Sequence, residues 1–224
     1  EGNKPMSVLN DKAARALQTI FRTAFNRNRA YGNICSEAHY AACRQIGDEG
    51  VVLLQNNNRI LPLDTKKYKH ILVVGENATR SLTKGGGSSE LKTKKDVTPL
   101  EAIRAMYGND VDYAQGYLSG RAMYDHVDQV SSDELARLSS EAVEKAKKAD
   151  LIIYVGGMNK NTKQDCENSD RDDYNLSYGQ NELIAKLAKN CPNIVVVMVS
   201  GNAYAMPWKN NVKAIVQAWY LGSE

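Results

Sequence analysis

The segment LIIYVGG, Leu151–Gly157, is an almost unbroken apolar run that predicts a β-strand buried on both faces. Other apolar runs predict four more strands, at HILVVGEN (70–77), VDYAQG (111–116), NIVVVMVSG (193–201) and KAIVQAWY (213–220). Three segments between them have the apolar spacing of helices: TPLEAIRAMYG (98–108), SSDELARLSSEAVEKAKKA (131–149) and YGQNELIAKLAKN (178–190). This alternation predicts an α/β fold with a doubly wound, mainly parallel sheet and helices on both faces, a three-layer α/β/α sandwich. The link between the last two strands, residues 202–212, is too short for a full crossover helix, so the direction of that pairing stays open.

Three of the predicted helix starts carry the Ser/Thr-x-x-Glu/Gln pattern of a capping box, in which side chain and backbone exchange hydrogen bonds. They are Thr98–Glu101, Ser131–Glu134 and Ser177–Gln180. We therefore expect a helix to begin just after Thr98, Ser131 and Ser177.

The N-terminal part of the chain has a different organisation. Apolar residues at helical spacing predict a helix over Asp11–Phe25, and the polar stretch that follows it predicts a linker. Ser36 is a suitable N-cap for a second helix, which we expect to run to about Leu54. The N-terminus lacks the basic and apolar regions of a signal peptide and does not begin with Met, so a mature form or an excised part of a longer protein is expected.

The composition is that of a globular protein and argues against several functional classes. Of the 224 residues, 42% are hydrophobic and 25% are charged, and the net charge is only +3. This balance predicts no nucleic-acid partner, and no apolar run approaches the roughly 18 residues of a membrane span. The four cysteines, Cys35, Cys43, Cys166 and Cys191, form no CxxC pair and predict no metal site, while their disulfide status stays open.

Three loops leave the predicted carboxyl ends of the strands, where open α/β sheets bind ligands. They are Glu76–Val97 with KGGGSSELK (84–92), Gly156–Leu176 with KQDCENSDRDDYNL (163–176), and Gly201–Trp208. The glycine-rich loop lacks the spacing of a phosphate-binding loop, so a flexible polar loop is the alternative to a ligand-facing turn.

The second of these loops, residues 163–176, is called the acidic loop here because it carries five carboxylates, Asp165, Glu167, Asp170, Asp172 and Asp173. Its sixth and twelfth positions counted from Asp165 do not fit a calcium loop. Carboxylates so close together raise one another's pKa. On residue types alone they are either a solvated charge cluster or the surroundings of a catalytic carboxyl.

Several blocks of the chain resemble glycoside hydrolase family 3 proteins, in the order in which that family has them. HYAACRQIGDEGVVLLQN (39–56) with ILPL (60–63) is similar to a family segment in which a helix ending EGIVLLKN precedes LPL. ILVVGENA (71–78), GGGSS (85–89) and TPLEAI (98–103) resemble the next block, and CENSDR (166–171) with NLSYGQNELI (175–184) resembles the one after it. VVVMVSGNAYAMPW (195–208) and AIVQAWYLGSE (214–224) resemble the last blocks, so that the likeness covers residues 11–224.

This resemblance implies that residues 1–33 are the end of a preceding barrel domain with a linker helix, and that residues 34–224 are the C-terminal α/β-sandwich domain, truncated at its C-terminus. It implies a retaining β-glycosidase of β-glucosidase or β-xylosidase type, with no cofactor, that acts on a β-linked oligosaccharide or glycoside. The family's nucleophilic Asp lies in the barrel, in a Ser-Asp-Trp-type motif that this chain lacks. The barrel domain is therefore the expected partner, and the chain alone is expected to be inactive. Related proteins are often exported, so an extracytoplasmic location, periplasmic or secreted, is expected.

The resemblance also implies roles for individual residues. Matching CENSDR (166–171) to the family's EGxDR block puts the general acid/base on Glu167. Asp165 and Asp170 would surround it with negative charge, and we expect Arg171 to be structural and to offset part of that charge by pairing with Asp170. In a retaining mechanism the acid lies roughly 5–5.5 Å from the nucleophile and needs burial or a neighbouring negative charge to hold its proton. Asn168 stands where the family usually has Gly, which leaves Asp165 as the alternative proton donor.

The glycine-rich loop corresponds to a wall of the family's sugar site. This implies substrate-binding roles for Gly86, Gly87, Ser88 and Ser89, whereas Trp208 is expected to pack beneath the loop rather than to stack on a sugar. The alternative function is a non-catalytic carbohydrate-binding or scaffold module of the same fold, which the Asn168 departure favours.

Overall fold

The computed structural model describes residues 4–64, 66–83, 91–108, 111–120, 129–167, 169–220 and 222–223. The chain forms two compact units, one up to Ser36 and one from Glu37 onwards. The first unit contains helix α1, Met6–Thr23, which begins earlier than the predicted Asp11 because the Pro5 carbonyl already accepts hydrogen bonds from the next turn. No residue of α1 is buried, although Leu17, Ile20 and Phe21 recur at the spacing of an apolar face.

The second unit is built on a six-stranded sheet with the strand order β1-β6-β5-β4-β2-β3. Its strands are β1 Val52–Asn56, β2 Ile71–Val74, β3 Asp112–Ala114, β4 Leu151–Gly157, β5 Ile194–Val199 and β6 Ala214–Gln217. Pairing is parallel from β3 through β2, β4 and β5 to β6, whereas β1 runs antiparallel to β6. The mainly parallel sheet is thus confirmed, and the pairing that the sequence left open is parallel.

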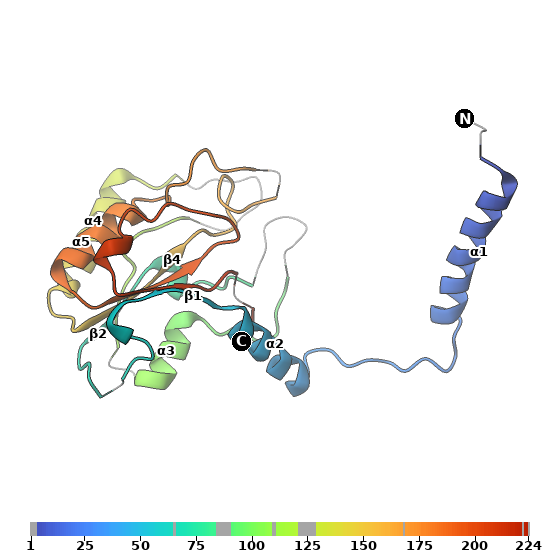
Figure 1. The fold of residues 1–224 in the computed structure, drawn as a ribbon, viewed down its shortest axis with the longest axis horizontal. Coiled ribbons are helices and arrows are strands. Elements are labelled where there is room, and N and C mark those ends of the chain that lie inside the picture. Colours follow the sequence, from blue (N-terminus) through green and yellow to red (C-terminus); the bar gives the residue numbers. More distant parts are fainter. Residues whose placement is uncertain are drawn as a thin grey trace. The chain divides into compact units, whose positions relative to one another are not determined.

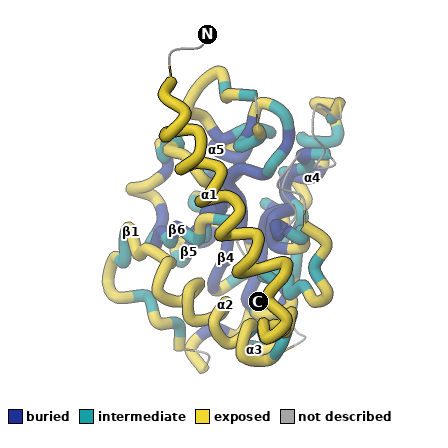
Figure 2. Tube along the Cα trace, turned by 90° about the vertical axis from the view of Figure 1, so that its right-hand side faces the viewer, coloured by how far each residue is buried: buried dark blue, intermediate teal, exposed yellow. Residues whose placement is uncertain are grey.

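Helices pack on both faces of the sheet. Helices α4 Ser132–Ala146 and α5 Gln180–Asn190 cover one face, and α3 Pro99–Tyr107 covers the other (Figure 1). Strand β4 is buried by both layers, because Ile152 and Tyr154 join the core beneath α4 and α5 while Leu151 and Ile153 join the core beneath α3. Figure 2 shows this interior in dark blue, whereas α2, Glu37–Gly50, has no buried residue. The three-layer α/β/α sandwich is confirmed.

The predicted extension of the second helix to about Leu54 is wrong. Helix α2 ends at Gly50, and the chain continues as strand β1 from Val52. The run VVLL contains two β-branched residues, which fit a pleated strand better than a helix. Its pairing with β6 supplies hydrogen bonds to a strand that would otherwise be an open edge, at the cost of an irregular register between Leu53 and Gln55.

Two of the three predicted caps form. Thr98 and Glu101 make the full capping box, and the Ser131 side chain accepts a hydrogen bond from the Glu134 amide. The box at Ser177 is wrong, since α5 begins after Gly179, which has a φ of 69°. The Gln180 side chain is not available for capping because it is buried and bonded to both backbone groups of Gly157.

The parallel sheet brings the carboxyl ends of β2, β4, β5 and β6 to one edge, and two of these exits are very tight. At Gly157, with a φ of +112°, a Cβ atom would lie 2.2 Å from the Val199 carbonyl oxygen. At Gly75, with a φ of +127°, it would lie 1.9 Å from the Val155 carbonyl oxygen. The loops that follow β2 and β4 therefore start from backbone pressed against the neighbouring strand.

We expect Gly157→Ala to lower the free energy of unfolding by at least about 3 kcal/mol, because it adds a backbone clash to the strain of a positive φ. Gly108→Ala is the matched control, since Gly108 has a φ of +98° but a Cβ atom there would meet no atom of the described residues within 4 Å. Its expected loss is about 1 kcal/mol. Urea unfolding followed by circular dichroism measures both, and equal losses would contradict the importance of the close β4–β5 approach.

Candidate active site

The acidic loop begins from a buried stretch after β4. Asn159 and Asn161 are 3% and 1% exposed. The Asn159 side chain accepts a hydrogen bond from the Asn161 amide at 2.9 Å, and the Asn161 side chain donates to the Ser119 carbonyl oxygen at 2.7 Å. The Asn77 side chain, after β2, donates to the Met158 carbonyl oxygen at 3.0 Å. Loops that follow β2, β3 and β4 are thus joined beneath the acidic loop.

Glu167 lies in a tight turn that is fixed at both ends. The Ser169 amide donates to the Cys166 carbonyl oxygen at 3.4 Å, and the Ser169 hydroxyl accepts from the Lys163 amide at 2.9 Å. Glu167 itself is exposed, and Asn168 lies outside the described residues. The turn holds the Glu167 backbone in place while leaving its side chain accessible to solvent.

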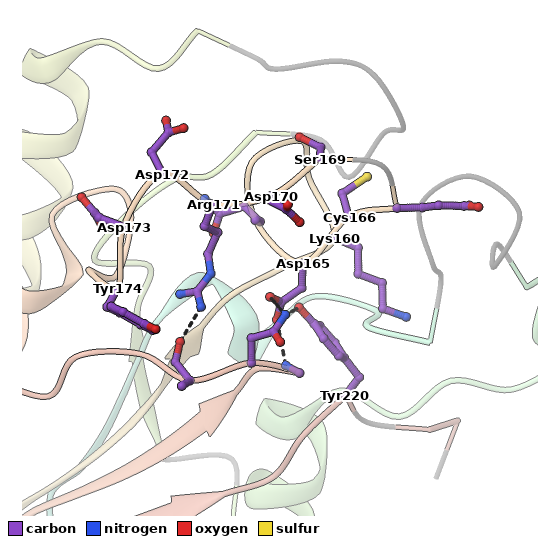
Figure 3. A pocket seen from close by; sticks show the side chains of 15 residues that line it. Lys160, Asp165, Cys166, Ser169, Asp170, Arg171, Asp172, Asp173, Tyr174 and Tyr220 are labelled. Atoms are coloured by element: carbon purple, nitrogen blue, oxygen red, sulfur yellow. Dashed lines mark hydrogen bonds between the residues drawn. The ribbon is translucent and has the colours of Figure 1, made fainter.

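The Asp165 carboxylate is the main tie between the acidic loop and the rest of the sheet edge (Figure 3). Its Oδ2 atom accepts hydrogen bonds from the Gly201 amide at 2.7 Å and from the Tyr220 hydroxyl at 2.8 Å. Its Oδ1 atom accepts from the Asn202 side-chain amide at 3.0 Å. These partners follow β5 and β6, so one carboxylate joins the loops of three adjacent strands.

Tyr220 supports this tie through its protonated hydroxyl. Burial, and then the negative charge of Asp165, raises the pKa of Tyr220. The hydroxyl keeps its proton as a result, and it also lies 3.1 Å from the Asn159 carbonyl oxygen. Gly201 leaves room for the ring, because a Cβ atom there would lie 3.3 Å from Tyr220.

Arg171 joins the same two loops in a different way from the prediction. Its guanidinium donates to the Ala203 carbonyl oxygen, and among the described residues no ion pair with Asp170 forms, so that prediction is wrong. The ion pair of the acidic loop is instead Lys163–Asp172, with 3.0 Å between Nζ and Oδ2. Backbone pairing of the loops explains the choice, since Ala205 donates to the Tyr174 carbonyl oxygen at 2.7 Å and brings Ala203 within reach of Arg171.

These loops surround a cavity of about 810 Å³, which is large enough for a sugar unit. All five carboxylates of the acidic loop line it, together with only two cationic side chains of the described residues, Lys160 and Arg171. The other lining residues are Gln164, Cys166, Ser169, Tyr174, Gly201, Asn202, Ala203 and Tyr220. The acidic loop therefore forms a wall of a hollow at the edge where α/β sheets bind ligands, and four of its five carboxylates are exposed there.

The structure brings together Glu167, Asp165, Asp170 and Arg171 around this cavity. The expected substrate-binding residues Gly86, Gly87, Ser88 and Ser89 lie outside the described residues. Trp208 is 1% exposed and donates its indole N–H to Asn181 at 2.9 Å, so it packs in the core and does not line the cavity. Its expected position beneath the glycine-rich loop concerns a loop that lies mostly outside the described residues.

Sequence reasoning missed Lys160, Asn202 and Tyr220. Tyr220 follows the last strand, and the carboxyl-end rule that selected the other loops would have selected it once the β6 direction was known.

In the part of the chain that the structure describes, no group of three or more His, Cys, Asp or Glu side chains could hold a metal ion. All four cysteines are free thiols, and Cys166 lines the cavity. No helix among the described residues has the length and apolar character needed to cross a membrane.

Comparison with known proteins connects this geometry with one family. The model of the glycosyl hydrolase family 3 C-terminal domain matches residues 51–224. A β-glucosidase of Bacteroides ovatus is 53% identical over the whole chain, which corresponds to 30% of that protein. A probable β-D-xylosidase of Arabidopsis thaliana is 32% identical over 86% of the chain and 24% of that protein. The chain thus spans less than a third of the length of these relatives.

Solved structures show a similar fold. A family 3 β-glucosidase of Bifidobacterium adolescentis, 29% identical, superimposes with a TM-score of 0.71 over 93% of this chain and 28% of its own. A β-glucosidase of Streptomyces venezuelae superimposes with a TM-score of 0.82 over 99% of this chain and 40% of its own. At 19% identity the second similarity shows the fold alone.

We expect Asp165→Ala to lower the free energy of unfolding by about 2–4 kcal/mol, because it leaves several donors of the neighbouring loops without an acceptor. Asp172→Ala is the control from the same loop. It breaks an exposed ion pair and should cost less than about 1 kcal/mol. Chemical denaturation measures both, and a small loss for Asp165→Ala would show that the loops are held by other contacts.

Proposed function

The chain belongs to glycoside hydrolase family 3, as a C-terminal domain of that family, and we propose that it supplies the general acid/base of a retaining β-glycosidase. Glu167 is the proposed acid/base. The observation that carries the proposal is that Glu167 lies on an anchored turn and lines a sugar-sized cavity with four further carboxylates. The relatives named as β-glucosidases and a β-xylosidase support the reaction class.

The hydrogen bonds of Asp165 argue against Asp165 as the proton donor. Asp165 accepts from an amide, a hydroxyl and a carboxamide, which engage both of its oxygen atoms. Such a carboxylate acts as an acceptor that holds loops together. Glu167 is exposed on the turn two residues later and lines the cavity, where its side chain can reach a ligand.

The mechanism that fits these residues has two steps. In the first, Glu167 gives its proton to the oxygen of the leaving group while a carboxylate of the barrel domain attacks the anomeric carbon and the glycosidic bond breaks. In the second, the Glu167 carboxylate removes a proton from water, which attacks the same carbon and releases the sugar from the nucleophile. At the end Glu167 is protonated again and the nucleophile is again a free carboxylate, so one acid/base serves both steps.

The remaining parts of the proposal concern the whole protein. Residues 1–33 would be the end of the barrel domain and its linker, and residues 34–224 the sandwich domain. The substrate would be a β-linked oligosaccharide or glycoside cleaved at its non-reducing end, and the protein would act outside the cytoplasm.

Glu167→Gln in the full-length enzyme should lower kcat/KM by about 10²–10⁴-fold for glycosides with alkyl or sugar leaving groups, which need protonation. Glycosides of strongly acidic phenols should retain nearly the wild-type kcat/KM, because their leaving groups depart without a proton. The second step of these substrates should still be slow in the variant, because it needs the general base. Azide should restore its rate, since azide attacks the glycosyl-enzyme without a general base.

Asp172→Asn is the matched control, as it removes a carboxylate of the same loop that is engaged by Lys163. Its losses should be small and equal for both substrate types. An equal loss for both substrate types in Glu167→Gln would contradict the acid role, and an inactive wild-type protein would favour a non-catalytic carbohydrate-binding module.

The 224-residue chain by itself should not hydrolyse an aryl β-glycoside, because the proposed nucleophile belongs to the barrel domain. A continuous assay of released phenol measures this. Clear turnover by the chain alone, which disappears in Glu167→Gln, would show that both carboxyl groups lie in this domain.

A further inference from the structure

We propose that Lys160 is a specificity residue of this site that donates hydrogen bonds to hydroxyl groups of the sugar on the leaving-group side. The inference rests on the proposed function, since it concerns the substrate that Glu167 protonates. Lys160 lies outside the block CENSDR (166–171) that resembles the family, so its role is inferred from the structure alone. Three properties support the role: a rigid backbone, a contact with an aromatic ring, and the lack of an acidic partner among the described residues.

The backbone around Lys160 is held by buried neighbours. The residues on either side, Asn159 and Asn161, are almost fully buried and hydrogen-bonded to one another. The Asn159 carbonyl oxygen also accepts from the Asp165 amide at 3.2 Å, and Asn161 is bonded to Ser119. The half-buried side chain of Lys160 therefore enters the cavity from a rigid base, as a binding residue needs to do.

The side chain is held on one side by an aromatic ring. The Lys160 Nζ atom lies 4.8 Å from the centre of the Tyr220 ring, a cation–π contact (Figure 3). Tyr220 is itself held by the 2.8 Å hydrogen bond to Asp165. The ring thus orients the ammonium group, yet it accepts no conventional hydrogen bond and leaves the three N–H groups for another acceptor.

Lys160 makes no ion pair with any described residue, although five carboxylates line the same cavity. In that part of the chain no carboxylate oxygen lies within 4.0 Å of its Nζ atom, whereas Lys163 on the same loop is paired with Asp172 at 3.0 Å. Burial lowers the pKa of Lys160, which means that its ammonium has lost part of its hydration. An oxygen-rich ligand in the cavity would replace that hydration.

The charge of the cavity defines the class of that ligand. With Glu167 protonated and Asp172 paired with Lys163, three carboxylates of the cavity face two cations, Lys160 and Arg171. The small excess of negative charge disfavours uronic acids and sulfated or phosphorylated sugars. Neutral sugar hydroxyls are acceptors that this excess does not repel. Glu167 and Lys160 line one cavity, whereas the proposed nucleophile, and with it the ring that it attacks, belongs to the barrel domain. We therefore assign hydroxyls near Lys160 to the leaving-group side of the oxygen that Glu167 protonates.

The test compares two substrates of the full-length enzyme that share the cleaved sugar, a β-linked disaccharide and an aryl glycoside. Lys160→Met should raise KM for the disaccharide about 10-fold or more, as expected for a lost hydrogen bond to a charged group. KM for the aryl glycoside should change less than about threefold, because its leaving group has no hydroxyls to bind. Lys160→Arg keeps the cation over the ring and should recover most of the disaccharide affinity.

Lys163→Met is the control, since it removes a lysine of the same loop that is already paired with Asp172. Thermal unfolding establishes that each variant is folded, and Lys160→Gln replaces Lys160→Met if the latter does not fold. An equal loss for both substrates, or no loss for either, would overturn the proposal for Lys160 while leaving the role of Glu167 intact. A wild-type enzyme that cleaves neither substrate would overturn the proposed function itself.

Discussion

The Asp165 carboxylate is the interaction on which the arrangement of the site depends. Its partners Gly201 and Tyr220 are 36 and 55 positions away in the sequence, on loops that follow different strands. Hydrogen bonds to an ionised acceptor are stronger than those between neutral groups. Glu167, two residues after Asp165, and Lys160, five residues before it, take their positions from backbone that this carboxylate and the buried asparagines hold. The presence of Asp165 in the acidic loop is therefore explained by its structural role, and Asp165 need not take part in the reaction.

This convergence is possible only because β4, β5 and β6 are parallel. Parallel strands deliver all their carboxyl ends to one edge of the sheet, whereas an antiparallel β6 would have taken Tyr220 to the opposite edge. A glycine at the end of β4 brings these loops still closer together. Gly157 lets the chain leave β4 while its backbone touches the Val199 carbonyl, so the loops of β4 and β5 start side by side. A short carboxylate can then bridge them.

Local patterns in the sequence predicted the elements whose formation is decided locally. The apolar runs of β2, β4 and β5 indicated the layers, and the Thr98 capping box formed as expected. Predictions failed where a distant partner decides the outcome. Gln180 was expected to cap α5 but is bonded to Gly157, and Val52–Leu54 was expected in a helix but pairs with β6. Spacing within one segment carries no information about such partners.

The same limit applies to the site. A family pattern can single out Glu167, but the ring that orients Lys160 comes from a residue 60 positions later, so neither residue predicts the other. The predicted Arg171–Asp170 pair failed for the same reason, because the better acceptor is a backbone carbonyl at Ala203. The prediction paired residues that are adjacent in the sequence, whereas the observed partner is distant in the sequence and close only in space.

The charges of the cavity also match the charges that the proposed reaction develops. In an oxocarbenium-like transition state the sugar ring becomes positive while the departing oxygen becomes negative. An excess of carboxylates stabilises the first and opposes the second, so a wholly acidic site would hinder the departure of the leaving group. The proton of Glu167 resolves this conflict in the proposed mechanism, because it meets the charge on the departing oxygen while the other carboxylates of the cavity stay ionised. Lys160, which lies over Tyr220 and is paired with no acid in the described part of the chain, then keeps its N–H groups for hydroxyls of the leaving group, as the proposal for it requires.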